Sequence, residues 1–193
     1  MNAPVPAGSA PDCIESAERV IAATRMWLQK AVIGLQLCPF AAAPHLNDRV
    51  RYRVSTQRSS VGLLEELSEE LQSLQDADPL QCETTLLVHP QVLTDFLDYN
   101  DFLDECDAAL AELGLEGELQ VAGFHPSYQF AGTRAQDIEN YTNRSPYPML
   151  HLLREASVAR AVASFPDIDG ISARNIETLR RLGHEGWRKL WTT

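Results

Sequence analysis

The sequence predicts an α/β fold with a small, mainly parallel three-stranded sheet, helices mainly on one side of it, and a helical C-terminal third. Segments with strand and helix patterns alternate between residues 49 and 124, and this order favours parallel pairing through right-handed crossovers. Each expected strand has one relatively polar face, whereas a sheet covered on both sides is apolar throughout. Beyond residue 124 the pattern changes to a loop and short helices.

The chain has 193 residues, which fits one domain. We expect a tail over residues 1–13, rich in Ala, Pro, Gly and Ser, and a single α/β domain over residues 14–193. The four cysteines have no CxxC spacing, and no segment resembles a signal peptide or a membrane span. These features predict a soluble, cytoplasmic protein without disulfides.

The elements follow one another from residue 14. Apolar residues recur at helical spacing up to about residue 35, which predicts one amphipathic helix. Residues 49–54 alternate arginine with valine or tyrosine, so as a strand they place three arginines on one face. The next elements expected are a helix over 61–75, a strand over Thr84–Val88, a helix over 92–113 closed by Gly114, and a strand over Glu118–Phe124.

The C-terminal third is expected to be helical. A capping-box pair, Thr133 and Gln136, predicts a helix start. Three further short helices are expected, and Ser145, Ser157 and Ser172 are their candidate N-caps.

The charge is strongly acidic and unevenly distributed. The net charge is −11, and the segment between Arg58 and Arg134 contains sixteen Asp and Glu residues but no Lys or Arg. Nucleic-acid binding requires clustered basic residues, so we expect no nucleic-acid partner. The acidic segment is either the solvated face of two helices or a docking surface.

Two expected strands end in His-Pro, at His89 and at His125. Ligands bind beyond the carboxyl ends of strands in parallel sheets, so both imidazoles are expected at one edge. The alternative is that each proline simply ends its strand and the histidine fills a polar position. Tyr128, which follows His125 in a polar stretch, is a candidate substrate-binding residue.

A second group of polar residues lies directly before the segment Pro146-Tyr147-Pro148. Asp137 and Asn140 are candidates for orienting a catalytic histidine, and Asn143, Arg144 and Ser145 are candidates for binding substrate. Arg144 beside a helix N-terminus would hold an anion. Alternatively, these residues cap helices and form a salt bridge.

Two further candidates lie outside these groups. Cys38 precedes Pro39, and a helical turn opened there would lower the pKa of the thiol; the profile also fits a buried structural cysteine. His151 lies three residues before Arg154 on an expected helix, so both side chains would share one face and could line a pocket.

At these residues the sequence resembles a bacterial family of uncharacterised proteins, a domain of unknown function. The resemblance covers nearly the whole chain from about residue 25, and it implies no activity. It is carried by four motifs: Leu37-Cys38-Pro39-Phe40-Ala41, Phe124-His125-Pro126 with Tyr128-Gln129-Phe130, the run from Asn140 to Pro148, and the run from Leu150 to Glu155.

Three functions remain open. The first is an enzyme for a small anionic or amide-bearing molecule, with Cys38 as nucleophile and His125 as acid-base group. The second is a metal-dependent hydrolase that uses His89, His125 and His151, although no HxH or HxxxH spacing supports a metal site. The third is a ligand- or protein-binding module without catalysis. The residues identify no cofactor and no oligomeric state.

Overall fold

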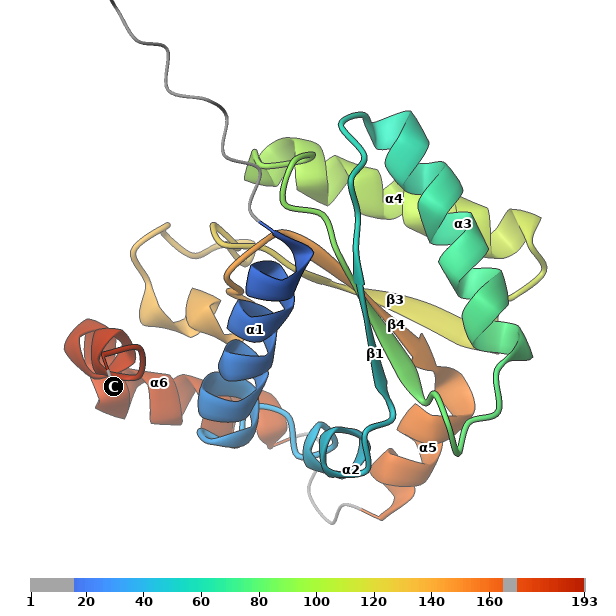
Figure 1. Cartoon of the computed structure of the whole chain (residues 1–193). Helices are drawn as coiled ribbons and strands as arrows, with labels where there is room; N and C mark the ends of the chain where they lie inside the picture. Colours follow the sequence, from blue (N-terminus) through green and yellow to red (C-terminus); the bar gives the residue numbers. More distant parts are fainter. Residues whose placement is uncertain (1–15, 165–169, 193) are drawn as a thin grey trace, which may run out of the picture.

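The computed structural model describes residues 16–164 and 170–192, so the tail predicted over residues 1–13 lies outside the described residues. At its centre is a four-stranded mixed sheet in the order β1-β2-β4-β3 (Figure 1). β1 and β2 are parallel, whereas β4 is antiparallel to both β2 and β3. The strands are β1 (Val50–Val54), β2 (Thr84–Val88), β3 (Leu119–Phe124) and β4 (Met149–Arg154). The α/β class and the three predicted strands are confirmed.

The prediction of only three, mainly parallel strands was wrong, because residues 149–154 form the fourth strand rather than a helix. A short apolar run fits a buried strand as well as a helix, and its local pattern does not distinguish them. The pairing with other strands identifies it as a strand, because β4 lies between β2 and β3 and pairs with both along its length. Successive side chains of a strand point to opposite faces, so His151 and Arg154 do not share a face as predicted.

Helices cover both faces of the sheet, so the prediction of helices mainly on one side was also wrong (Figure 1). α3 (Ser60–Asp76) and α4 (Phe96–Glu112) pack on one face, where the buried cluster includes Leu67, Leu87 and Tyr99. α1 (Ala17–Trp27) continues into the π-helical segment η1 (Leu28–Ile33) and packs on the other face. The buried residues Val20, Trp27, Leu86 and Met149 belong to this second cluster.

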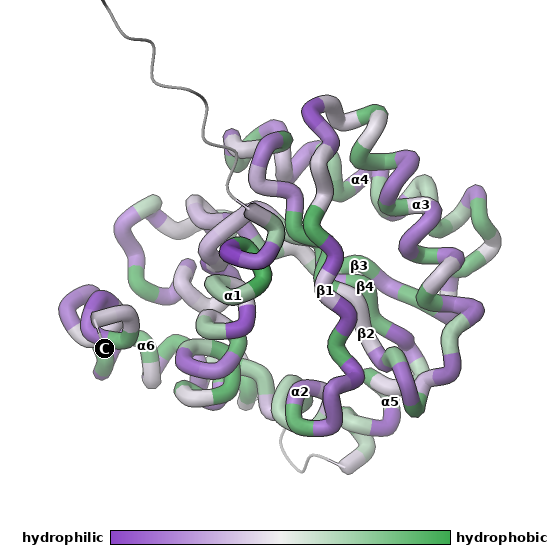
Figure 2. Tube along the Cα trace, in the orientation of Figure 1, coloured by the Kyte–Doolittle hydropathy of each residue, from purple (hydrophilic) through white to green (hydrophobic). Residues whose placement is uncertain are grey.

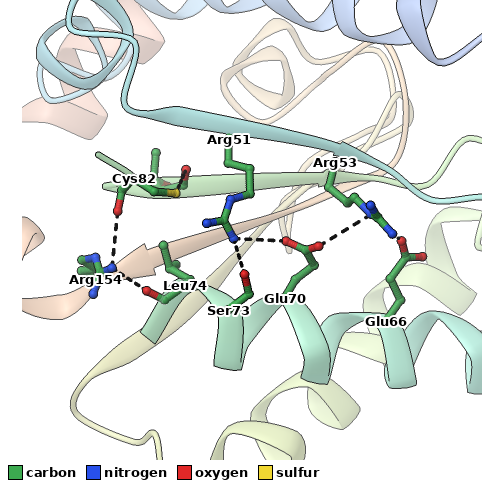
Figure 3. Close-up of polar contacts among 9 residues, drawn as sticks. Arg51, Arg53, Glu66, Glu70, Ser73, Leu74, Cys82 and Arg154 are labelled. Atoms are coloured by element: carbon green, nitrogen blue, oxygen red, sulfur yellow. Dashed lines mark hydrogen bonds and ion pairs between the residues drawn. The ribbon is translucent and has the colours of Figure 1, made fainter. Parts of the chain in front are cut away.

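Ion pairs explain why a covered sheet has a polar face on β1. Hydrophilic and hydrophobic residues alternate along β1 and along α3 (Figure 2). Arg53 Nε lies 3.0 Å from Glu66 Oε1 of α3, and Arg51 Nη1 lies 3.6 Å from Glu70 Oε2 (Figure 3). Arg51 also donates a hydrogen bond of 2.7 Å to Ser73 Oγ. The arginine face therefore packs against an acidic helix.

The remaining described elements are α2 (Ala42–Leu46), the 3-10 helix η2 (Ile138–Thr142), α5 (Glu155–Ala163) and α6 (Ile171–Lys189). The C-terminal part is helical as predicted, but its boundaries differ. No helix starts at Thr133, because its hydroxyl bonds to Phe130 O and Asn140 Oδ1 within a loop. Ser145 donates to Tyr147 O instead of capping a helix. No helix in the described ranges is long and apolar enough to cross a membrane.

Candidate functional site

A cavity of about 300 Å³ lies between the sheet and the elements η1, α2 and α5. We call it the sheet cavity. Its wall is mostly apolar and includes Leu28, Val32, Leu86, Phe124 and Leu153. Strand alternation places these sheet residues together, because even positions of β2 and β3 and odd positions of β4 point to the α1 side. A volume near 300 Å³ is at the lower end of the range for small-molecule sites.

The polar residues of the sheet cavity are unevenly placed. His151 lies opposite Leu86 of β2 and Ala122 of β3, in the middle of the sheet. Thr84 and Gln120 both pair with Leu153, one pleat closer to the end of β4. The cavity therefore has a polar end towards α5 and an apolar end towards Phe124.

His151 is held by a chain of two hydrogen bonds. Its Nε2 lies 2.7 Å from Thr84 Oγ1, which in turn donates a bond of 2.6 Å to Leu152 O. The threonine hydroxyl has one proton, so its oxygen accepts from His151 Nε2–H. Burial lowers the pKa of His151 to about 4. The imidazole is therefore neutral at pH 7, with its proton on Nε2.

Cys38 lines the same cavity from the segment after η1. The backbone N–H groups of Phe40 and Ala41 hydrogen-bond the sulfur, as expected for a thiol at the start of a turn. Burial is the larger effect, however, and it raises the pKa of the Cys38 thiol above its ordinary value. The protonated thiol is the resting form of this residue.

His89 and His125 do follow β2 and β3 at the same edge of the sheet, but both pack against α4. Their rings lie 5.8 Å and 5.0 Å from the ring of Tyr99. His125 Nδ1 accepts from Ser127 N–H and its Nε2 donates to Leu93 O. His89 donates from Nδ1 to Val92 O. Burial lowers the pKa of His125, and it lowers that of His89 to about 4.

The sheet separates the residues that the sequence paired for catalysis. Cys38 packs in the cluster on the α1 side, whereas His125 contacts Phe96 and Tyr99 of α4. The geometry therefore does not bring this nucleophile and base together. The three histidines of the metal hypothesis are divided in the same way, and the described residues contain no group of three or more His, Cys, Asp or Glu that could hold a metal ion.

The polar residues between 128 and 145 hold their own loop together. Asn140 is fully buried, accepts from Phe130 N–H and Thr133 Oγ1, and donates to Arg134 O. Asp137 Oδ2 accepts from Arg134 N–H at 2.8 Å. Within the described part of the chain, neither Asp137 nor Asn140 hydrogen-bonds a histidine; both side chains join segments of the loop to each other.

Arg144 is also occupied within this loop. Its guanidinium donates to Tyr128 O at 3.2 Å and to Ala135 O at 2.6 Å, and it stacks 4.4 Å from the centre of the Tyr141 ring. Asn143 donates to Gly123 O. Arg144 and Ser145 line a different hollow of about 410 Å³, together with residues of α1 and α6. The candidate anion clamp therefore lies outside the sheet cavity.

Arg154 fixes the end of α3. Its Nη2 donates to Leu74 O at 2.5 Å and to Ala77 O at 2.6 Å, with a longer contact of 3.4 Å to Cys82 O (Figure 3). Backbone carbonyls at a helix C-terminus lack helical partners, and a guanidinium satisfies them well. This contact gives Arg154 a structural role, although part of the residue borders the sheet cavity.

A profile described as "Protein of unknown function (DUF1415)" matches residues 19–189. The chain belongs to the DUF1415 family. The resemblance noted from the sequence motifs is thus confirmed at the level of the family, whose description gives no activity. No curated protein and no solved structure matches the chain.

In this DUF1415 protein, three of the site residues predicted from the sequence line the sheet cavity: Cys38, His151 and Arg154. The polar residues Thr84 and Gln120, together with Glu83 and Ser157, also line the wall and were not predicted as site residues. The alternation of polar and apolar residues along β2 and β3 indicates which side chains share a face of the sheet. It assigns them to one cavity only when residues 149–154 are known to form the strand between β2 and β3.

Proposed function

We propose that this DUF1415 protein binds a small, uncharged and mostly apolar molecule in the sheet cavity. The observation that carries the proposal is an apolar hollow with one neutral imidazole in its floor. Small-molecule sites have this composition: apolar walls supply affinity and a few polar groups fix orientation.

The charged groups at the wall support an uncharged ligand. Glu83 Oε2 is already paired with Arg49 Nη1 at 3.0 Å. The guanidinium of Arg154 is engaged at the end of α3. An anion in the cavity would therefore lose its hydration without gaining a free positive partner, which is costly. The hypothesis of an anionic substrate depends on Arg144, which lines the other hollow.

A matched pair of substitutions on α5 tests the proposal. Ala161 lines the sheet cavity, whereas Ala159 of the same helix is exposed. A161F fills the cavity and A159F does not. Neutral naphthalene derivatives serve as probes, with binding measured by calorimetry and thermal shift, since a ligand of the native state raises its stability. We expect binding to the wild type and to A159F, and a loss of at least about tenfold in A161F. Equal binding by both variants would contradict the proposal.

A thiol-dependent enzyme is the second candidate, because Cys38 and His151 line the same cavity. The geometry thus offers His151, rather than His125, as the base. This function requires a thiolate, and burial works against one by raising the pKa of Cys38. Rapid alkylation of Cys38 at pH 7 that is lost in H151Q would favour catalysis over simple binding.

A further inference from the structure

The hydrogen bonds that connect His151, Thr84 and Leu152 O determine which ring nitrogen of His151 carries the proton, and therefore whether the ring offers the sheet cavity a donor or an acceptor. Thr84 Oγ1 has two close polar neighbours, His151 Nε2 at 2.7 Å and Leu152 O at 2.6 Å. A carbonyl oxygen only accepts, so the single hydroxyl proton goes to Leu152 O. The hydroxyl oxygen then faces Nε2 with a lone pair, and this requires a proton on Nε2.

The other neutral tautomer breaks this arrangement. With its proton on Nδ1, His151 would turn an Nε2 lone pair towards Thr84 Oγ1. The hydroxyl could then satisfy either the ring or Leu152 O, but not both. One of the two contacts, 2.7 Å to His151 Nε2 or 2.6 Å to Leu152 O, would then hold two lone pairs against each other with no proton between them. This corresponds to a population ratio of roughly tenfold or more against this tautomer.

Nδ1 is therefore the acceptor that remains for an occupant. No residue in the described part of the chain donates to it, and the partly exposed ring lines the cavity. Its surroundings are apolar: Leu86 and Ala122 flank His151 on the neighbouring strands, and the Phe124 ring is centred 6.1 Å away. A lone pair in such surroundings gains most from a ligand that brings a donor.

We propose that His151, fixed by Thr84, makes the sheet cavity selective for apolar molecules that carry a hydroxyl or N–H group. This inference rests on the proposed function, because it specifies the ligand class of the same cavity. Ethers, ketones and carboxylates present only acceptors, so they place a lone pair against Nδ1. Thr84 acts as a positioning residue, since it selects the tautomer through its own hydrogen bond rather than by touching the ligand.

Two measurements test the inference. The first is ¹⁵N NMR of the histidine ring nitrogens in the wild type without ligand, which should show His151 neutral at pH 7 with its proton on Nε2. The second compares 2-naphthol with 2-methoxynaphthalene, which differ in the donor. We expect 2-naphthol to bind at least about tenfold more tightly in the wild type. T84S keeps the hydroxyl and should keep the preference for 2-naphthol. T84V removes the hydroxyl, so the proton of His151 can lie on either ring nitrogen, and the preference should fall several-fold.

The outcomes separate the inference from the proposed function. If the NMR spectrum shows the proton on Nδ1, the inference is overturned whether or not a probe binds. If both probes bind the wild type equally, the cavity is a binding site but its donor selectivity is refuted. If neither probe binds, the proposed function fails and the ligand class fails with it. If T84V keeps the preference for 2-naphthol over 2-methoxynaphthalene, Thr84 does not position the His151 proton.

Discussion

Replacing Arg154 by methionine tests whether its guanidinium is a structural group. Methionine keeps much of the apolar stem but leaves Ala77 O without its donor and removes one of the two donors of Leu74 O, which keeps its bond from Ala77 N–H. A carbonyl left unsatisfied costs about 1–3 kcal/mol and the loss of one further hydrogen bond about 1 kcal/mol, so we expect a loss of about 2–3 kcal/mol in the free energy of unfolding. Urea denaturation measures this loss: with a slope of about 2 kcal/mol per M, the midpoint should fall by roughly 1–1.5 M.

Arg51 provides a matched control for this substitution (Figure 3). Its side chain is 31% exposed and lies 3.6 Å from Glu70, which keeps Arg53 as a second partner. R51M should therefore lose no more than about 1 kcal/mol. R154K, which keeps the charge but loses the planar fork, should lie between the two. Similar losses in R51M and R154M, or a loss below about 1 kcal/mol in R154M, would show that the contact with α3 does not stabilise the fold.

Three further predictions concern stability and reactivity. N140L removes three hydrogen bonds inside the loop and should cost about 2–4 kcal/mol in urea unfolding. N143A removes the bond of 3.2 Å to Gly123 O and the bond with the Tyr128 side chain, and it should cost about 1 kcal/mol. Because burial raises the pKa of Cys38, its alkylation by iodoacetamide, followed by mass spectrometry, should be several-fold slower at pH 8 than that of glutathione and should accelerate above pH 9. The pKa values of His89 and His151 lie at about 4, below 6.5 for an unfolded histidine, so the unfolded chain binds protons first as the pH falls. Stability should therefore decrease from pH 6.5 towards pH 4, by up to about 1.4 kcal/mol per pH unit for each group. Burial lowers the pKa of His125 as well, so H151Q should remove roughly a third to a half of the histidine-dependent slope between pH 6.5 and 5. A flat stability profile over that range would contradict these pKa values.

The elements with strong local signals were predictable from the sequence. The strand over Thr84–Val88 has the predicted bounds, and α3 differs from the predicted helix by one residue at each end. Gly114, with a positive φ, follows the end of α4 as predicted. The start of this helix was predicted at residue 92, whereas it begins at Phe96 after the N-cap Asp95. These elements depend on periodicity and capping, which are properties of a few neighbouring residues.

The fourth strand was not predictable in this way. Residues 149–154 form β4 because β2 and β3 present open edges on either side, and that information lies about 65 and 30 residues away in the chain. The error had a large effect on the site. It placed His151 and Arg154 on one face, and it hid the contact of His151 with Thr84.

Polar residues of the loop before β4 and the polar residue His151 within β4 have different structural reasons to be there. Apart from the short 3-10 helix η2, the segment from residue 128 to 145 is irregular, so many of its backbone groups lack strand or helix partners. Side chains such as Asn140 and Arg144 supply hydrogen bonds to these groups. A dense polar motif there is explained by folding alone. His151 lies in a central strand whose backbone is paired on both sides. An apolar residue at that position would avoid the cost of burying an imidazole, so the fold does not explain this histidine, whereas a ligand that needs an acceptor in the sheet cavity does.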